Sequence, residues 1–152
     1  MTGGLADGFY PHEDGTMEIQ LSMVGVIVRD MPTALRFYRR LGLEIPASED
    51  DKRFFLHRMG TGVTLFFDTV FAAHYDAEYR APESGGYGAM LEFYMGDNAS
   101  VDAKYAELTN LGYEGRMPPQ QTSGPYAAMI NDPDGNVLLL TSDDALSGAA
   151  QT

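Results

Sequence analysis

One pattern of elements occurs twice along this chain of 152 residues, and the repeat restricts the possible folds more than any other feature of the sequence. Each copy begins with an apolar, β-branched segment, continues with a segment of helical period and ends with two apolar segments joined by a glycine-containing turn. Val28-Arg29-Asp30 in the first copy corresponds to Met95-Gly96-Asp97 in the second. The repeat predicts two equivalent units of an α+β fold.

The helix of the first unit is predicted to begin after Asp30, because aspartate caps helix N-termini and Pro32 fits the first turn. It is predicted to end at Gly42. The residues expected on its buried face are Ala34, Phe37, Tyr38 and Leu41. In the second unit Asn98 or Ser100 is expected to cap the helix and Gly112 to close it.

A fourth strand for each unit is expected in the less regular segments 42–49 and 112–118. The predicted boundaries are a flexible N-terminal segment 1–16, a first module 17–82, a second module 83–143 and a flexible tail 144–152. The segment 69–89 between the two units is predicted to be a long loop that carries several aromatic residues. Loops of this length are usually functional or interfacial.

The formal net charge of −12 predicts that the protein binds neither nucleic acid nor anionic membranes, and it favours a cationic ligand. Solubility alone is the alternative explanation of this charge. The chain has no cysteine, which excludes disulfides and thiolate metal sites and fits a cytoplasmic location. No apolar run approaches the roughly 18 residues of a membrane span, and the N-terminal sequence does not resemble a secretory signal.

The segments "VIVRDMPTALRFYRRLGLEI" and "DPDGNVLLL", supported by "DAKYAELTNLGYEG", resemble the vicinal oxygen chelate superfamily. This superfamily includes glyoxalase I, extradiol dioxygenases, and fosfomycin- and bleomycin-resistance proteins. The resemblance covers about residues 17–142. It implies two tandem βαβββ modules whose sheets curve into a cup, with the helices on the outer face, a homodimer, and in the family's enzymes a divalent metal in the cup.

The resemblance also implies where the metal ligands would lie. The two histidine positions are occupied here by Met23 and Met90, and the two carboxylate positions by Thr64 and Leu139. None of these side chains is an imidazole or a carboxylate, which divalent metals of this class require. We therefore expect a member of the family without metal ligands and without a cofactor.

The histidines offer one alternative, a relocated metal site. The three histidines are His12, His57 and His74. No two of them have the spacing of neighbours on one helix or strand face, and His57 is interpreted as an ordinary strand residue.

Side chains alternate along a strand, so the four ligand positions and their next-but-one neighbours are predicted to face the cup. The predicted ligand-binding residues are Met23, Gly25, Thr64, Phe66, Asp68, Met90, Glu92, Tyr94, Leu139 and Thr141. Gly25 is expected to leave room for a group of the ligand. Asp68 lies near a strand end, where we expect exposure to solvent.

Methionine and aromatic side chains suit a planar or irregular organic molecule. The chain is accordingly predicted to be a metal-free binding protein of the bleomycin-resistance type, which sequesters a planar or cationic ligand such as an antibiotic. The alternative is a metal-independent isomerase or lyase with Glu92 as general base. Glu92 has two further interpretations. It could pair with an arginine at the surface or dimer interface, or it could recognise a cationic group of the ligand. A third class of function is a protein that acts through its dimer surface.

Overall fold

The computed structural model describes residues 21–83 and 86–142, so the predicted terminal segments 1–16 and 144–152 lie outside the described residues. The first half contains β1 (Met23–Ile27), α2 (Met31–Leu41), the 3-10 helix η1 (Ala47–Asp51), β2 (Phe54–Arg58), β3 (Thr64–Asp68) and α3 (Phe71–His74). The second half contains β4 (Met90–Tyr94), α4 (Asn98–Asn110), β5 (Gly115–Gln121), β6 (Tyr126–Asn131) and β7 (Val137–Thr141).

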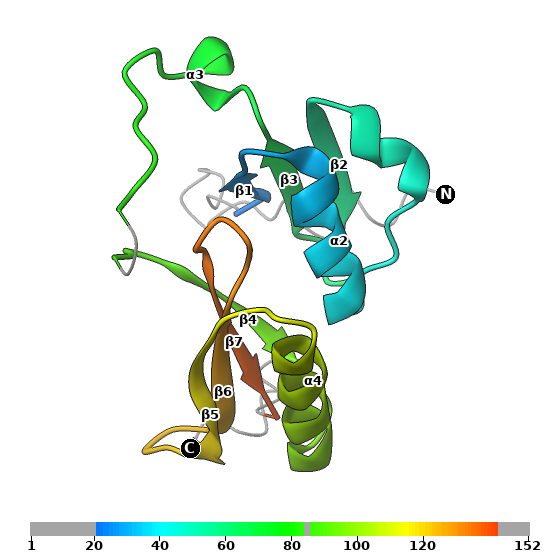
Figure 1. Ribbon diagram of the computed structural model, residues 1–152, viewed down its shortest axis with the longest axis vertical. Helices are drawn as coiled ribbons and strands as arrows, with labels where there is room; N and C mark the ends of the chain where they lie inside the picture. Colours follow the sequence, from blue (N-terminus) through cyan, green and yellow to red (C-terminus); the bar gives the residue numbers. More distant parts are fainter. Residues whose placement is uncertain (1–20, 84–85, 143–152) are drawn as a thin grey trace, which may run out of the picture.

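The strands form two sheets that share one plan (Figure 1). In the first sheet, of order β1–β3–β2, the first strand pairs with the last in parallel and the hairpin is antiparallel. The second sheet, of order β4–β7–β6–β5, pairs its strands in the same way and adds β5 at its edge. The predicted α+β repeat is therefore confirmed.

The fourth strand expected at 42–49 is wrong for the described part of the first module, where η1 follows a short extended segment. The guanidinium of Arg39 donates hydrogen bonds to the carbonyl oxygens of Ile45 and Pro46 at 2.6 and 2.7 Å. It also contacts the Asp50 carboxylate at 2.7 Å. Arg39 thus occupies carbonyl groups that a sheet ladder would need. The fourth strand of the second module is present as β5, near the predicted segment.

The helix ends follow the capping residues closely. The Asp30 carboxylate accepts a hydrogen bond from the Thr33 amide at 3.1 Å, and Gly42 follows α2 with a positive φ of 131°, as predicted. For α4 the prediction of Asn98 or Ser100 as the cap is wrong, because the Asp97 carboxylate accepts from the Ser100 amide at 2.8 Å. Asp97 has the extended backbone that a capping residue needs, whereas Asn98 is already helical.

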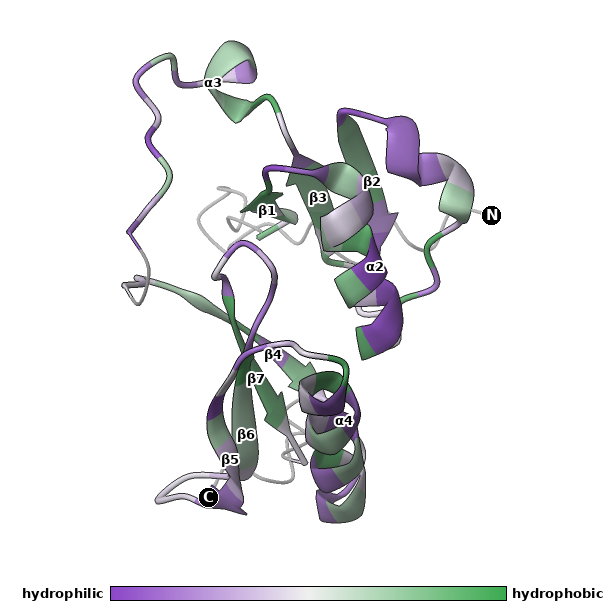
Figure 2. Ribbon diagram, in the orientation of Figure 1, coloured by the Kyte–Doolittle hydropathy of each residue, from purple (hydrophilic) through white to green (hydrophobic). Residues whose placement is uncertain are grey.

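The hydrophobic core contains residues of α2, α4 and strands of both sheets, and the strands contribute alternate residues to it. In Figure 2 the strand ribbons have mainly hydrophobic colours. Val26, Leu65, Leu138 and Leu140 are buried in this core, as the predicted alternation requires. All four residues predicted for the inner face of α2 are buried as well. The opposite sheet faces are consequently the ones available to form a site. Within the described residues, no helix has the length and apolar character of a transmembrane span.

Candidate functional site

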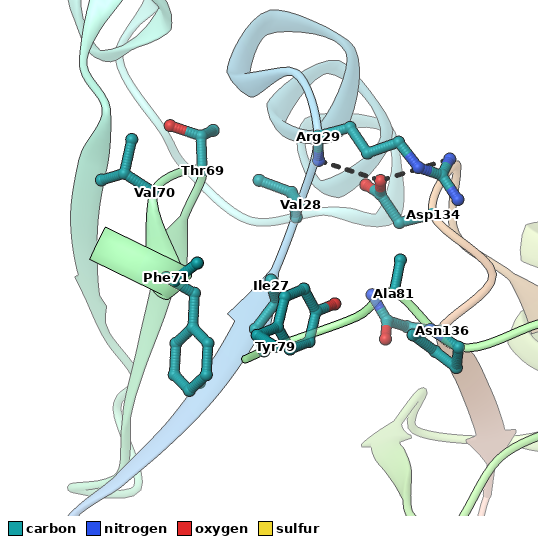
Figure 3. A pocket seen from close by; sticks show the side chains of 13 residues that line it. Ile27, Val28, Arg29, Thr69, Val70, Phe71, Tyr79, Ala81, Asp134 and Asn136 are labelled. Atoms are coloured by element: carbon teal, nitrogen blue, oxygen red, sulfur yellow. Dashed lines mark hydrogen bonds and ion pairs between the residues drawn. The ribbon is translucent and has the colours of Figure 1, made fainter. Parts of the chain in front are cut away.

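A cavity of about 460 Å³ opens where the two halves of the chain meet (Figure 3). Its floor comes from the end of β1, with Gly25 and Ile27, and one wall from the segment after β3. The other wall is the β6–β7 turn, which contributes Asp134 and Asn136. The volume falls within the range of roughly 300–1,000 Å³ that small-molecule sites occupy.

The cavity has an apolar side and a polar side. Phe71 and Tyr79 lie on the apolar side beside Ile27, and the two aromatic rings meet edge to face with centroids 5.3 Å apart. In Figure 3 the Asp134 carboxylate and the Asn136 amide lie across from them. An aromatic wall facing a few polar groups is the usual composition of a pocket that orients an organic molecule.

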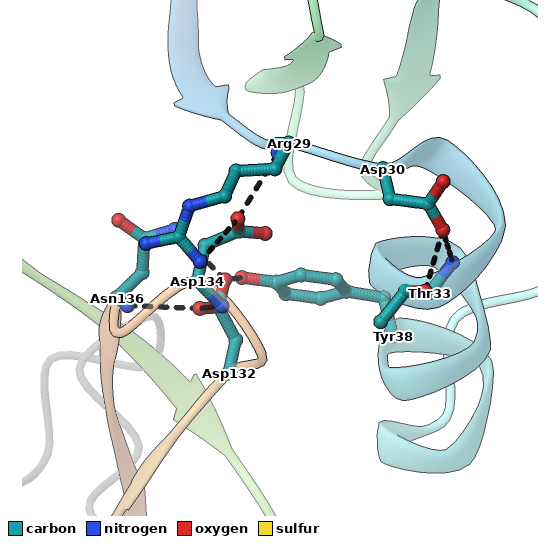
Figure 4. Close-up of polar contacts among 7 residues, drawn as sticks. All are labelled: Arg29, Asp30, Thr33, Tyr38, Asp132, Asp134 and Asn136. Atoms are coloured by element: carbon teal, nitrogen blue, oxygen red, sulfur yellow. Dashed lines mark hydrogen bonds and ion pairs between the residues drawn. The ribbon is translucent and has the colours of Figure 1, made fainter. Parts of the chain in front are cut away.

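The β6–β7 turn is held in place by a buried phenol from the first half (Figure 4). The Tyr38 hydroxyl donates a hydrogen bond to the Asp132 carboxylate at 2.7 Å, and both residues are buried. The same carboxylate accepts bonds from the Asp134 and Asn136 amides at 2.9 and 2.8 Å and from the Asn136 side chain at 2.8 Å. The hydrogen bonds of Asp132 thus stabilise the "DPDGN" turn, which forms one wall of the cavity.

Asp134 is the only carboxylate among the described residues that line the cavity, and its side chain is 9% exposed. It accepts a hydrogen bond from the Arg29 amide at 3.0 Å, and its ion pair with the Arg29 guanidinium is longer, at 3.7 Å. Burial raises the pKa of Asp134 above its ordinary value, and the nearby carboxylates of Asp132 and Asp30 raise it further, against the lowering effect of Arg29. At this end of the cavity the three carboxyl groups of Asp30, Asp132 and Asp134 thus lie near a single arginine.

Of the ten residues predicted to bind a ligand, most lie outside this cavity. Gly25 lines it, and Met90 lines a smaller hollow of about 100 Å³ between β1 and β4. Met23, Met90 and Tyr94 are exposed on the open sheet faces, each 46% accessible. The remaining residues line neither hollow; they are Thr64, Phe66, Asp68, Glu92, Leu139 and Thr141.

Two expectations for the first sheet are corrected. The space beside Gly25 is occupied by the ring of Phe66, which a β-carbon at position 25 would strike. Asp68 is fully buried rather than exposed, because the chain turns back over it after β3. Its carboxylate accepts hydrogen bonds from the Val70 amide at 2.8 Å and pairs with Nδ1 of His74 at 3.1 Å.

Glu92 lies on the open face of the second sheet and is exposed. Its carboxylate accepts a hydrogen bond from the Thr141 hydroxyl at 3.1 Å. None of the ion pairs between described residues includes it. The arginine partner considered from the sequence is therefore absent from the described part of this chain.

The metal implied by the fold family does not fit the side chains at the ligand positions. Met23 pairs with Thr64, whereas Met90 pairs with Val137, so the residue equivalent to Leu139 in the first module is Phe66 and not Thr64. A thioether, a phenyl ring, a hydroxyl or an aliphatic chain at these positions offers no imidazole or carboxylate oxygen to a hard or borderline cation. Within residues 21–83 and 86–142, no three histidine, aspartate or glutamate side chains are grouped so that they could hold an ion.

The family of this chain is identified by a match to a protein-family model. A family model described as the Glyoxalase/Bleomycin resistance protein/Dioxygenase superfamily matches residues 20–140. The chain belongs to this superfamily. No curated protein matches the sequence.

Solved structures of the superfamily share the fold of this glyoxalase-like chain. A family enzyme from Burkholderia phytofirmans PsJN is 22% identical, with 80% of this chain and 97% of that chain covered and a TM-score of 0.67. A glyoxalase-related enzyme from Fulvimarina pelagi is 17% identical, with 82% and 88% covered and a TM-score of 0.66. A superfamily member from Sphaerobacter thermophilus DSM 20745 is 27% identical, with 82% and 97% covered and a TM-score of 0.59.

Several residues that line the cavity of this superfamily member were not among the predicted site residues. Tyr79 belongs to the long aromatic segment that was predicted to be functional or interfacial. The sequence did not indicate that Tyr79 itself lines a cavity. Asp134 and Asn136 belong to the turn motif, where ordinary turn chemistry explains both residues. The pairing of His74 with Asp68 has no sequence signal, because it depends on how α3 folds back.

Proposed function

We propose that this chain is a metal-free binding protein that holds a small organic molecule with a planar, apolar body in the 460 Å³ cavity. The observation that carries the proposal is the composition of that cavity, with the aromatic pair Phe71 and Tyr79 facing the polar groups of Asp134 and Asn136. A ligand would place its flat body against the rings and its polar groups toward the turn. The corresponding biological role is sequestration of a small molecule, as in bleomycin-resistance proteins.

A thermal-shift screen of planar metabolites and antibiotics, run with and without added divalent metal, tests this proposal. A ligand at 100 times its dissociation constant adds about 2.7 kcal/mol to the free energy of unfolding. Tyr79→Leu should weaken binding. Tyr75→Leu is the matched control, because both tyrosines contact Phe71 but only Tyr79 lines the cavity. Equal effects of the two substitutions, or a shift that requires metal, would contradict the proposal.

A metal-independent enzyme is the second candidate function, and the Asp68–His74 pair favours it. The buried carboxylate of Asp68 fixes the imidazole through Nδ1, which leaves Nε2 to exchange a proton. The side chain of His74 is 42% exposed and lies beside Phe54 and Tyr75 in an open hollow. Glu92, the base suggested by the sequence, is exposed too, and its carboxylate accepts one hydrogen bond from the described residues, from the Thr141 hydroxyl.

Turnover separates the two candidates. An isomerase or lyase that uses this pair should lose activity in His74→Gln, whereas one that uses Glu92 should lose it in Glu92→Gln. A binding protein should show no turnover of the ligands found in the screen, and both variants should still bind them. A protein that acts only through its dimer surface should show no ligand-dependent rise in melting temperature.

A further inference from the structure

A second pocket, of about 240 Å³, adjoins the main cavity on the far side of the β6–β7 turn. The two hollows share Arg29, Pro82 and Asp134 as lining residues, so they lie next to one another. The second pocket is lined in addition by Glu83, Glu114 and Asn131. We call it the acidic side pocket.

Asn131, at the end of β6, is a lining residue of this pocket and has an unsatisfied hydrogen-bond acceptor. The residue is only 6% exposed, and its side-chain nitrogen donates to the Glu114 carboxylate at 2.9 Å. Its side-chain oxygen is buried and has no hydrogen-bond partner within the described part of the chain. Buried acceptors are nearly always paired, and one without a partner calls for a donor. A ligand with N–H groups would supply that donor.

The charges around the pocket favour a cationic donor. The Asn131 bond uses one oxygen of Glu114, and the Arg29 amide uses one oxygen of Asp134, so each carboxylate has an oxygen free of these bonds. The single cation among the described lining residues is Arg29, whose side chain is 69% exposed and lies 3.7 Å from Asp134. A primary ammonium group offers three N–H donors and one positive charge, which matches spaced carboxylate oxygens together with an amide oxygen.

We infer that the acidic side pocket binds the primary ammonium group of a ligand whose planar body occupies the main cavity. This inference rests on the proposed binding function and names the chemical class of the ligand. The ammonium group contacts the carboxylates of Glu114 and Asp134, and a shift of the Asn131 side chain on binding brings its buried oxygen to the same group. Because the two hollows adjoin at Pro82, the inference requires a short aliphatic linker that passes this residue.

The test compares 2-(1-naphthyl)ethylamine with 2-(1-naphthyl)ethanol, which differ only in the terminal group. Isothermal titration at neutral pH should show the amine binding about tenfold more tightly, as expected when charge-assisted hydrogen bonds replace neutral ones. The side-chain amide resonance of Asn131 should shift with the amine and not with the alcohol. Glu114→Gln should remove most of the preference for the amine, because it removes the charge and retains an oxygen that can accept from Asn131.

Glu107→Gln is the matched control, since Glu107 lies on α4 and pairs with Lys104 at 2.9 Å, outside both hollows. The same loss of preference in both variants would show an effect of net charge alone and would overturn the inference. Equal affinity of the wild-type protein for amine and alcohol, with binding still dependent on Tyr79, would overturn the ammonium subsite and leave the proposed function intact. Binding of neither probe would overturn both.

Discussion

Tyr38 connects the two halves of the molecule through a single side chain. Its ring packs edge to face on Phe37 and Phe67, with centroids 5.0 Å away in each case, and its hydroxyl ends at the Asp132 carboxylate. That carboxylate organises the turn that forms one wall of the cavity. The residue therefore contributes both to the core and to the geometry of the site.

Tyr38→Phe should lower the free energy of unfolding by about 1–3 kcal/mol, because it removes a donor from a buried carboxylate and leaves the ring in place. Urea denaturation measures this change. Tyr94→Phe is the control, because the Tyr94 hydroxyl donates to the carbonyl oxygen of Gly96 at the surface. An equal loss in both variants would mean that the buried hydrogen bond has no special role.

The stability of the protein should also depend on Tyr38 at alkaline pH. Burial raises the pKa of Tyr38 well above its usual range, and the Asp132 carboxylate raises it further. Tyrosine in the unfolded chain titrates near about pH 10, so the stabilisation is complete below that pH and declines as the pH rises toward the folded-state pKa. Denaturation series from about pH 9 to about pH 11 should therefore show a steeper loss of stability in the wild type than in Tyr38→Phe. Parallel curves would contradict this assignment.

At the scale of elements, Arg39 explains why the two modules differ. Its guanidinium joins the last turn of α2 to the segment that leads into η1. The first module consequently has three strands in its described part where the second has four. Arg39 thus holds the segment before η1 in a conformation that does not extend the sheet.

Arg39→Gln should lower the free energy of unfolding by about 1–2 kcal/mol, since it removes charge-assisted hydrogen bonds at a partly buried position. Arg36→Gln provides the comparison, because Arg36 is exposed on the same helix. Protection of the amides in η1 against hydrogen exchange should fall in Arg39→Gln and stay unchanged in Arg36→Gln. Unchanged protection in both variants would count against this role of Arg39.

At the scale of the whole molecule, the side chains at the family's metal-ligand positions cannot bind a divalent metal, and we therefore predict that the protein works without one. A chelator should leave its melting temperature and ligand binding unchanged, and elemental analysis should find no stoichiometric nickel, zinc, iron or manganese. Leu139→Glu should reduce stability by about 1–2 kcal/mol and create no site, because Leu139 pairs with Glu92 and the substitution places two carboxylates side by side. One tightly bound divalent ion per cup would refute the prediction.

We also propose that the protein is a homodimer. Met23 and Met90 are exposed on the strands β1 and β4, which have one hydrogen-bonded neighbour each, and such edges and apolar faces favour association. Light scattering at micromolar concentration should give twice the mass of the chain. Met90→Glu should shift the protein toward monomer, whereas Leu111→Glu should not, because the exposed Leu111 lies at the C-terminal cap of α4. A wild-type monomer would contradict the proposal.

The sequence by itself determined the repeat, the two long helices and the strand residues that form the core. These features depend on local chemistry: Asp30 and Gly42 bound α2, and the alternation along β1, β3 and β7 places Val26, Leu65, Leu138 and Leu140 in the core. The sequence also shows that Met23, Met90 and Leu139 cannot be ligands of a divalent metal of this class, because residue identity alone decides whether a side chain can coordinate the ion.

The tertiary structure decided the rest. It places Tyr79 of the aromatic segment opposite Asp134 of a distant turn, buries Asp68 against His74 and fills the space beside Gly25 with Phe66. Strand pairing also reveals that Phe66, and not Thr64, corresponds to Leu139. Each of these outcomes depends on contacts between segments far apart in the chain, or on how a loop folds back, and periodicity and local propensity contain no information about either.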